Sequence, residues 1–156
     1  MCVLIFAFFI FASMLLSSKD VKDEEPITNL TADEIELIER VVECEVRGNN
    51  ENDYQAKLAV ANVILNRYNP SNTEFPNTIE GVIFQKNQFT PVKSKIFYTI
   101  QVSDVTKKAV TDALNGTRII DSNVCYFCTI DCSNKKWFDT NLSYYNRIGP
   151  HDFYAS

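Results

Sequence analysis

Residues 31–48 read TADEIELIERVVECEVRG and predict the helix around which the rest of the fold is organised. Thr31 and Glu34 form a capping-box pattern, in which each side chain accepts a hydrogen bond from the other residue's backbone amide. The helix is therefore expected to begin at the residue after Thr31. Gly48 and the asparagines that follow it tolerate left-handed backbone, so residues 47–50 should end the helix.

The apolar residues of this helix form one stripe when successive residues are placed about 100° apart around its axis. With Ile35 taken as the origin, Glu45 lies at about 280°, inside a stripe centred at about 300°. It also lies in the last turn of the helix. Glu36, Glu39 and Glu43 lie at about 100°, 40° and 80°, toward the face expected to be wet. Glu34 is explained by capping, so Glu45 alone is a carboxylate on the apolar face without a structural role. The apolar residues of the stripe are Ile35, Ile38, Val41, Val42 and Val46.

A carboxyl group packed against apolar side chains is hard to ionise, so its pKa rises and it can donate a proton near neutral pH. That property suits protonation of a glycosidic oxygen. Glycoside hydrolases usually add a second carboxylate, whereas a lytic transglycosylase needs only one, because a hydroxyl of the sugar itself attacks. The helix pattern equally allows a structural interpretation, in which Glu45 forms a partly buried ion pair with Arg47 or Arg67.

The remaining elements are read from periodicity and turn residues. Residues 54–67 are rich in Ala and apolar on most faces, which predicts a central buried helix. Asn62 within it is expected to bind a neighbouring backbone group. Residues 137–154 are aromatic with little periodicity. The other predictions are a short helix at 78–84, a loop running into an extended stretch at 85–92, a helix at 103–116 and a strand at 124–127.

The composition is that of one ordinary domain with a short appendage: 156 residues, 46% hydrophobic and 22% charged. Residues 3–16 are uncharged and mostly apolar, which is typical of an export segment. They are shorter than the roughly 20 residues of a spanning helix, which favours a signal peptide at 1–18 over a membrane anchor. Residues 19–29 predict an acidic polar linker before an exported folded domain at 30–156.

Charge and cysteine usage restrict the partners. The net charge is −5 and no run of Lys and Arg forms a basic stripe, which argues against nucleic acid. Four cysteines in an exported domain favour disulfides or buried free thiols, because their spacing lacks the paired C-x2-C pattern of zinc sites. No metal and no cofactor are predicted, and the protein is expected to be a monomer. The four are Cys44, Cys125, Cys128 and Cys132.

Several blocks of sequence carry a resemblance: EVRG at 45–48, AVANVILNR at 59–67, FPNTIEGVI at 75–83, QFTPV at 88–92 and IGPHDFY at 148–154. In this order they resemble the catalytic domain of the SleB/CwlJ-type cell-wall hydrolase family, the spore-cortex lytic enzymes of germination. The resemblance implies an α+β, mainly helical domain of the lysozyme-like lytic transglycosylase type with a small β-sheet. It further implies cleavage of peptidoglycan glycan strands, with Glu45 as general acid/base and 1,6-anhydromuramic products.

Sugar-binding clefts combine aromatic surfaces with amides and hydroxyls. Six residues at matched positions offer these groups and are the candidate substrate contacts. For each aromatic, burial in the core is the commoner fate, and for a lone His a structural hydrogen bond is the commoner role. The six residues are Gln88, Phe89, Thr90, Tyr126, Trp137 and His151.

Two other functions fit parts of the sequence. A Cys/His peptidoglycan endopeptidase would use one thiolate beside His151, and alkylation of the cysteines would abolish it. A non-catalytic wall-binding module would keep the fold without releasing new sugar ends. The type of wall (spore cortex, vegetative or host) and the choice between transglycosylase and muramidase stay open at this level.

Overall fold

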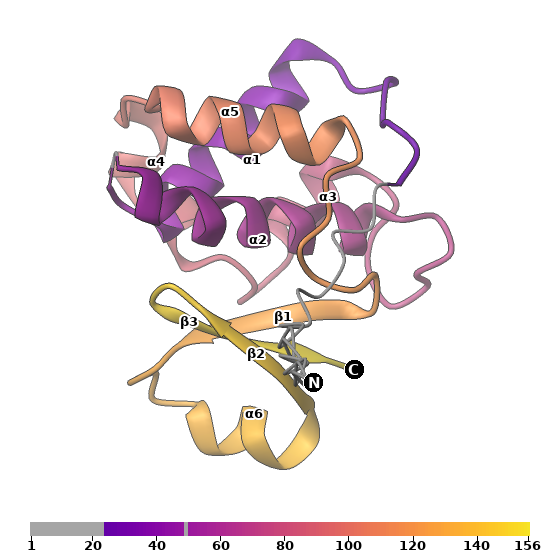
Figure 1. Cartoon of the computed structure of the whole chain (residues 1–156), viewed down its shortest axis with the longest axis vertical. Coiled ribbons are helices and arrows are strands. Elements are labelled where there is room, and N and C mark those ends of the chain that lie inside the picture. Colours follow the sequence, from indigo (N-terminus) through magenta and orange to yellow (C-terminus); the bar gives the residue numbers. More distant parts are fainter. Residues whose placement is uncertain (1–23, 49) are drawn as a thin grey trace, which may run out of the picture.

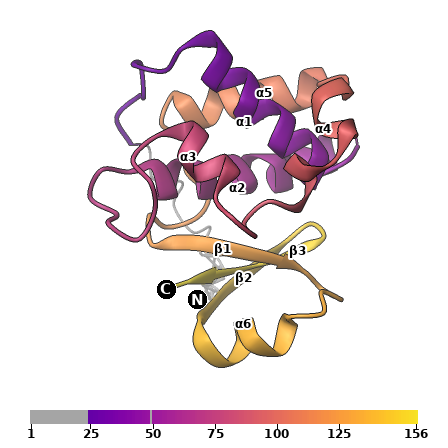
Figure 2. The same ribbon diagram turned by 180° about the vertical axis from the view of Figure 1, so that it is seen from behind.

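Helices and sheet form separate layers in the computed structural model, which describes residues 24–48 and 50–156. The sheet has three strands, and Figures 1 and 2 show α1 to α5 together above it, with α6 on its far side. The predicted mainly helical α+β class is confirmed, whereas the predicted segment 1–18 lies outside the described residues. The elements are α1 Ala32–Glu45, α2 Glu51–Tyr68, α3 Ile79–Phe84, η1 Thr90–Lys93, α4 Lys95–Thr99, α5 Asp104–Leu114, β1 Val124–Thr129, α6 Lys135–Asn141, β2 Ser143–Ile148 and β3 His151–Ala155.

α2 is the centre of the core, in contact with α1, α3, α5 and β1. Its residues from Leu58 to Leu65 are buried, as expected for a helix that is apolar on most faces. The amide of Asn62 donates to the Thr117 carbonyl at 3.0 Å and accepts from the Ile119 amide at 3.0 Å. Asn62 therefore binds the backbone after α5, as predicted.

α1 begins with the predicted capping box. The Glu34 amide donates to Thr31 Oγ1 at 3.3 Å, and the Thr31 amide donates to Glu34 Oε2 at 2.8 Å. At the other end the helix stops at Glu45, because Val46 is already extended, and Gly48 has a φ of 136°. The chain thus turns away directly after Glu45.

Loss of this cap is expected to destabilise the domain modestly. Thr31→Ala removes the side-chain acceptor of the box, and such caps contribute about 1 kcal/mol. Urea denaturation should show a lower midpoint with an unchanged slope, while Thr28→Ala, which alters an exposed threonine outside the helix, should leave the midpoint in place. Equal midpoints for the two variants would contradict the capping role.

The sheet is antiparallel, in the order β1-β3-β2. All residues of β3 are buried, because it is the central strand with packing on both faces. Gly149 has a φ of 57° between β2 and β3, and a Cβ there would lie 2.8 Å from the Ala56 side chain, so the hairpin turn packs against α2. No element was predicted for residues 137–154. They form most of α6, the outer strand β2 and most of the central strand β3.

Two further segments differ from expectation. The predicted extended stretch near residue 92 is instead η1 followed by α4. The described part of the predicted linker, residues 24–29, lies along the end of α5: the Ile27 amide donates to the Leu114 carbonyl at 2.8 Å, and Glu24 Oε2 accepts from Arg118 at 3.1 Å. Contact with the folded domain therefore begins at least six residues earlier than residue 30.

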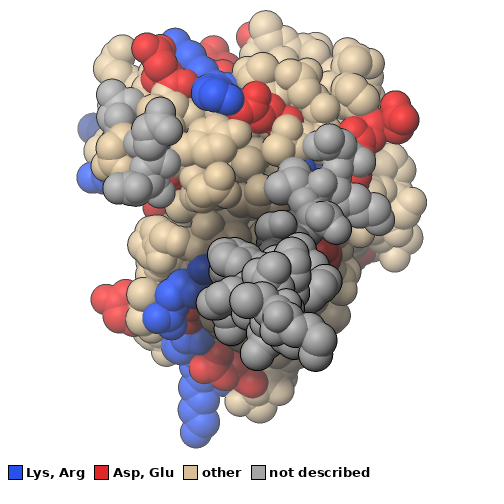
Figure 3. All heavy atoms as spheres, viewed as in Figure 1, with Lys and Arg blue, Asp and Glu red and all other residues tan. Residues whose placement is uncertain are grey.

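The described surface has a mixed distribution of charge. Figure 3 shows acidic and basic side chains interspersed toward both ends of this face, with uncharged surface between them. Among the described residues, no helix has both the length and the apolar character needed to cross a membrane.

Candidate functional site

Glu45 is the last residue of α1, and its side chain is partly exposed. Burial raises the pKa of Glu45 to about 7, although the positive charge of Arg67 acts in the opposite direction. Within the described residues, Glu45 forms no salt bridge with Arg47 or Arg67, so the structural interpretation as an ion pair is not realised. Glu45 is therefore a carboxyl group that can hold a proton near neutral pH and remain within reach of solvent.

A buried lysine holds the chain on both sides of Glu45. Lys57 on α2 has 0% exposure, and its Nζ donates to the Val46 carbonyl at 2.7 Å and to Glu43 Oε2 at 3.2 Å. The residue after Glu45 and the residue two positions before it are thereby tied to the same ammonium group. This arrangement fixes the end of α1 and with it the direction of the Glu45 side chain.

The prediction that Glu43 lies on the wet face is wrong. Glu43 is 7% exposed, and its carboxylate accepts hydrogen bonds from Ser103 Oγ at 2.7 Å and Thr106 Oγ1 at 2.5 Å. Burial alone would raise the pKa of Glu43, but these hydrogen bonds and the charge of Lys57 outweigh burial, so the pKa lies below its ordinary value. The start of α5 covers this side of α1, which a single apolar stripe does not reveal.

A cavity of about 210 Å³ brings several predicted residues together. Gln88 reaches it from the turn after α3, Tyr126 from β1 and Trp137 from α6. Trp137 is 53% exposed, which is unusual for so large an apolar side chain. The full lining is Arg67, Asn87, Gln88, Tyr126, Phe127, Asn134, Trp137 and Phe138.

The other three predicted contacts lie outside this lining. Thr90 is exposed at the start of η1, whereas Phe89 and His151 are each 1% exposed. Phe89 packs against Phe127, with ring centroids 6.2 Å apart, and His151 meets the Phe127 ring edge-on at 5.0 Å. Both buried rings therefore support the cavity wall from behind.

Burial also determines the state of His151 and of the thiols. It lowers the pKa of His151 to about 4, so the imidazole is neutral at pH 7. The described cysteines are free rather than disulfide-bonded, and burial raises the pKa of Cys44 and of Cys125. The described residues contain no cluster of His, Cys, Asp and Glu suited to a metal ion. Cys44 and Cys125, whose thiols burial keeps neutral, therefore do not supply the thiolate that a Cys/His peptidase requires.

Arg67 was considered in the sequence only as an ion-pair partner, yet it connects the two parts of the site. It lines the cavity, and its charge acts on Glu45. Its Nε donates to the Cys125 carbonyl at 2.7 Å, and its guanidinium carbon lies 4.9 Å from the centroid of the Phe89 ring. The available signal was a lone cation at the end of an apolar helix.

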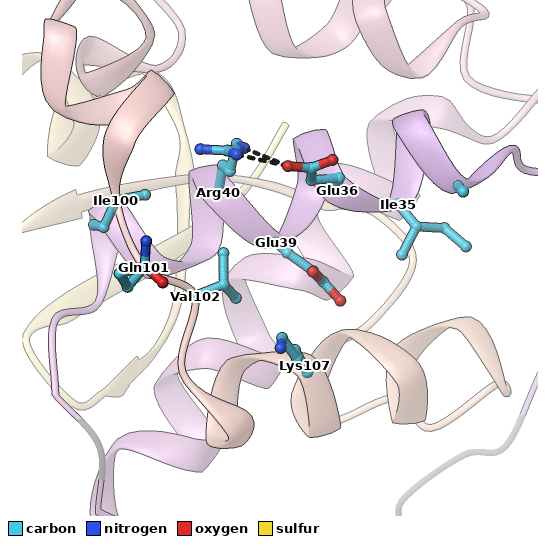
Figure 4. Close-up of a pocket in the computed structure, with 9 residues that line it drawn as sticks. Ile35, Glu36, Glu39, Arg40, Ile100, Gln101, Val102 and Lys107 are labelled. Atoms are coloured by element: carbon cyan, nitrogen blue, oxygen red, sulfur yellow. Dashed lines mark hydrogen bonds and ion pairs between the residues drawn. The ribbon is translucent and has the colours of Figure 1, made fainter.

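A wider hollow of about 500 Å³ lies between α1 and α5. Figure 4 shows Glu39 and Lys107 facing each other across it, with Glu36 and Arg40 paired at its edge, where their side chains are 2.6 Å apart. None of the predicted site residues lines this hollow. Its charged groups are matched on α1 and α5 themselves, so Glu45 and the smaller cavity remain the candidate site.

Comparison with known proteins gives a consistent assignment. Residues 51–154 match the family model described as Cell Wall Hydrolase, a range that begins after Glu45. The spore cortex-lytic enzyme of Bacillus cereus is 38% identical over 120 residues, which cover 77% of this chain and 43% of that protein. Its counterpart in Oceanobacillus iheyensis is 35% identical over 120 residues. The chain thus spans less than half the length of these relatives.

Solved structures agree with the sequence comparison. The catalytic domain of the germination-specific lytic transglycosylase SleB from Bacillus anthracis superposes with a TM-score of 0.70 and 34% identity, covering 81% of this chain and 98% of that one. The catalytic domain of the Bacillus cereus SleB protein gives a TM-score of 0.69. The shared fold therefore extends over nearly the whole of both catalytic domains.

Proposed function

The chain belongs to the cell-wall hydrolase family, and on this premise we propose that it cleaves the glycan strands of peptidoglycan as a lytic transglycosylase. The observation that carries the proposal is Glu45, a carboxyl group with a pKa of about 7, on which the charge of Arg67 in the lining of an aromatic cavity acts. Glycan cleavage needs both a proton donor and an aromatic surface on which a sugar ring can stack.

In the proposed reaction, protonated Glu45 donates its proton to the glycosidic oxygen as the bond to the anomeric carbon breaks. The 6-hydroxyl of the same muramic acid then attacks that carbon, and the Glu45 carboxylate takes up the hydroxyl proton. The product carries a 1,6-anhydro ring, and Glu45 ends the cycle protonated. One carboxyl group thus acts in turn as acid and base.

Two carboxylates of the described residues were considered as a second acid, and both have partners inside the protein. Glu74 accepts a hydrogen bond from the Tyr126 hydroxyl. Asp152 is 1% exposed and accepts from Arg147 at 2.7 Å, with Lys135 3.2 Å away. Asp152 is buried and paired with two cations, so it is poorly placed to activate a water molecule.

The predicted substrate contacts divide into two groups in this proposal. Gln88, Tyr126 and Trp137 line the cavity and would touch the sugar, with Thr90 beside the same turn. Phe89 and His151 are buried, so we assign them the support of the cavity wall. The protein would reach the cell wall by export directed by residues 1–18. The names of the relatives point to spore cortex as the substrate.

The rate of cleavage is expected to fall as the pH rises above about 7. Glu45 must begin the reaction protonated, and its pKa is about 7, so the active fraction declines about tenfold for each further pH unit. Below that value the acid form dominates, and the rate should level off until other groups titrate. Initial rates on purified peptidoglycan between pH 5 and about 9 would test this; a rate that stays constant to the upper limit would exclude Glu45 as the acid.

The reaction type is tested by the products. Purified spore-cortex peptidoglycan is digested with the full chain, and the new sugar ends are identified by mass spectrometry. Anhydromuramic ends are expected. Reducing ends would instead establish a muramidase, and cleaved stem peptides on intact glycan would establish a peptidase, so either result would overturn the proposed transglycosylase.

A further inference from the structure

Arg67 has a hydrogen-bond donor with no partner inside the protein. The residue is 3% exposed, and its Nη1 is buried without a hydrogen-bond acceptor among the described residues. Nearly all buried polar groups in proteins are paired, because an unpaired one loses its interaction with water without compensation. An exception in a residue that lines a cavity suggests that the acceptor comes from a bound ligand.

The guanidinium group is held firmly for such a role. Its carbon lies 4.9 Å from the centroids of the Phe75 and Phe89 rings and 5.6 Å from that of Tyr126. Its Nε is fixed by the Cys125 carbonyl at 2.7 Å. Nη1 is therefore a preorganised donor, and little side-chain entropy would be lost on binding.

The surrounding charges restrict the kind of acceptor. Burial lowers the pKa of Arg67 to about 10, and the negative charge of Glu74 is among the influences that act against that shift, so an acidic group already lies near the guanidinium. A further anion would be repelled by the Glu74 carboxylate. A neutral carbonyl oxygen can accept the hydrogen bond without that penalty.

The rest of the lining fits what would accompany such a carbonyl. Tyr126, Phe127, Trp137 and Phe138 provide aromatic surface, and Gln88 provides an amide. An acetamido group combines a carbonyl oxygen with a methyl group and stands on a sugar ring whose apolar face stacks on aromatic side chains. A free amino sugar would bring an ammonium group toward the Arg67 cation instead.

We infer that Arg67 Nη1 donates a hydrogen bond to the acetyl carbonyl oxygen of an N-acetylated amino sugar bound in this cavity. The inference rests on the proposed function, because it identifies one group of the same glycan substrate. It makes Arg67 the residue that distinguishes N-acetylated from de-N-acetylated glycan beside Glu45.

Calorimetric binding to the full chain carrying Glu45→Gln tests this without relying on cleavage. The two probes are the trimer of N-acetylglucosamine and the trimer of glucosamine. The acetylated trimer is expected to bind at least about tenfold more tightly, since one hydrogen bond to a charged donor is worth about that ratio. Adding Arg67→Lys should remove this preference, because the lysine ammonium lacks the fixed Nη1 direction.

The matched control is Arg118→Lys, which changes another buried arginine. Arg118 is 5% exposed and bonds the Ala113 carbonyl at 2.5 Å, and it does not line the cavity. This variant should keep the acetyl preference while suffering a comparable loss of thermal stability. If Arg67→Lys also kept the preference, the inference would be overturned.

An NMR measurement on the Glu45→Gln chain with Arg67 intact covers the case in which Arg67→Lys fails to fold. The Nη1 protons of Arg67 should shift on addition of the acetylated trimer and not of the glucosamine trimer. A shift caused by a free stem peptide instead would mean that the acceptor is a carboxylate, against the inference. Both measurements report binding and not cleavage. Acetyl-selective binding at Arg67 without any glycan cleavage by the wild-type chain would refute the proposed function alone. Glycan cleavage without acetyl-selective binding at Arg67 would refute this inference alone.

Discussion

Glu45→Gln is expected to lower the rate of glycan cleavage by about 100- to 10,000-fold, the usual contribution of a general acid. The amide has nearly the same shape as the carboxyl group, so it should leave the end of α1 in place, but it has no acidic proton to transfer. Binding of the glycan should persist, because Glu45 is not part of the cavity lining. The measurement is the initial rate of release of sugar ends from purified peptidoglycan.

Stability measurements on the same variant separate loss of chemistry from loss of fold. The unfolded chain releases the Glu45 proton near its ordinary pKa of 4.5, whereas the folded protein holds it to about 7, so this group's contribution to stability falls as the pH rises through that window. Glu45→Gln removes the dependence and should be at least as stable as the wild type at pH 8.

Glu39→Gln is the matched control on the same helix. Burial also raises the pKa of Glu39, but this residue faces the hollow between α1 and α5. Its substitution should leave the cleavage rate within about twofold, since an effect without a catalytic role is small on this scale. Comparable losses in both variants would show that Glu45→Gln acts through the helix and not through proton transfer.

Lys57→Met is expected to lower the free energy of unfolding by about 3–5 kcal/mol, the cost of leaving one partner of a buried ion pair uncompensated. The substitution removes the ammonium group that bonds the Val46 carbonyl, Glu43 and Thr106. Chemical denaturation at pH 7 would measure the loss.

Two comparisons identify the cause of that loss. Lys108→Met breaks an exposed i,i+4 pair with Asp112 and should cost less than about 1 kcal/mol. Combining Lys57→Met with Glu43→Leu should recover part of the stability, because the buried charge is removed together with its partner. A Lys57→Met chain as stable as Lys108→Met would contradict the structural role of the ammonium group.

The sequence sufficed for those features that depend on local pattern. The capping box, the buried helix α2 and the inward position of Glu45 follow from residue spacing alone, and the structure has each of them. Their common property is that one helix face, or one turn, determines the outcome.

The failures depend on contacts between distant segments. Glu43 was placed on the wet face because periodicity detects one buried face, while its partners Ser103 and Thr106 come from a helix about 60 residues away. The strand from His151 to Ala155 was missed for a similar reason. A central strand buried on both faces has no polar alternation to recognise.

The arrangement of the sheet also sets an order of events for a chain emerging from the ribosome. β1 and β2 each bond to β3 and not to each other, and β3 follows both in sequence. Helices form rapidly from local contacts, so the helical layer can assemble while neither outer strand has a partner. The cavity draws its walls from β1 and α6 as well as α2. In a nascent chain the Glu45 helix can therefore form before the cavity, because the β1 wall of the cavity gains its partner strand only when residues 151–155 are available.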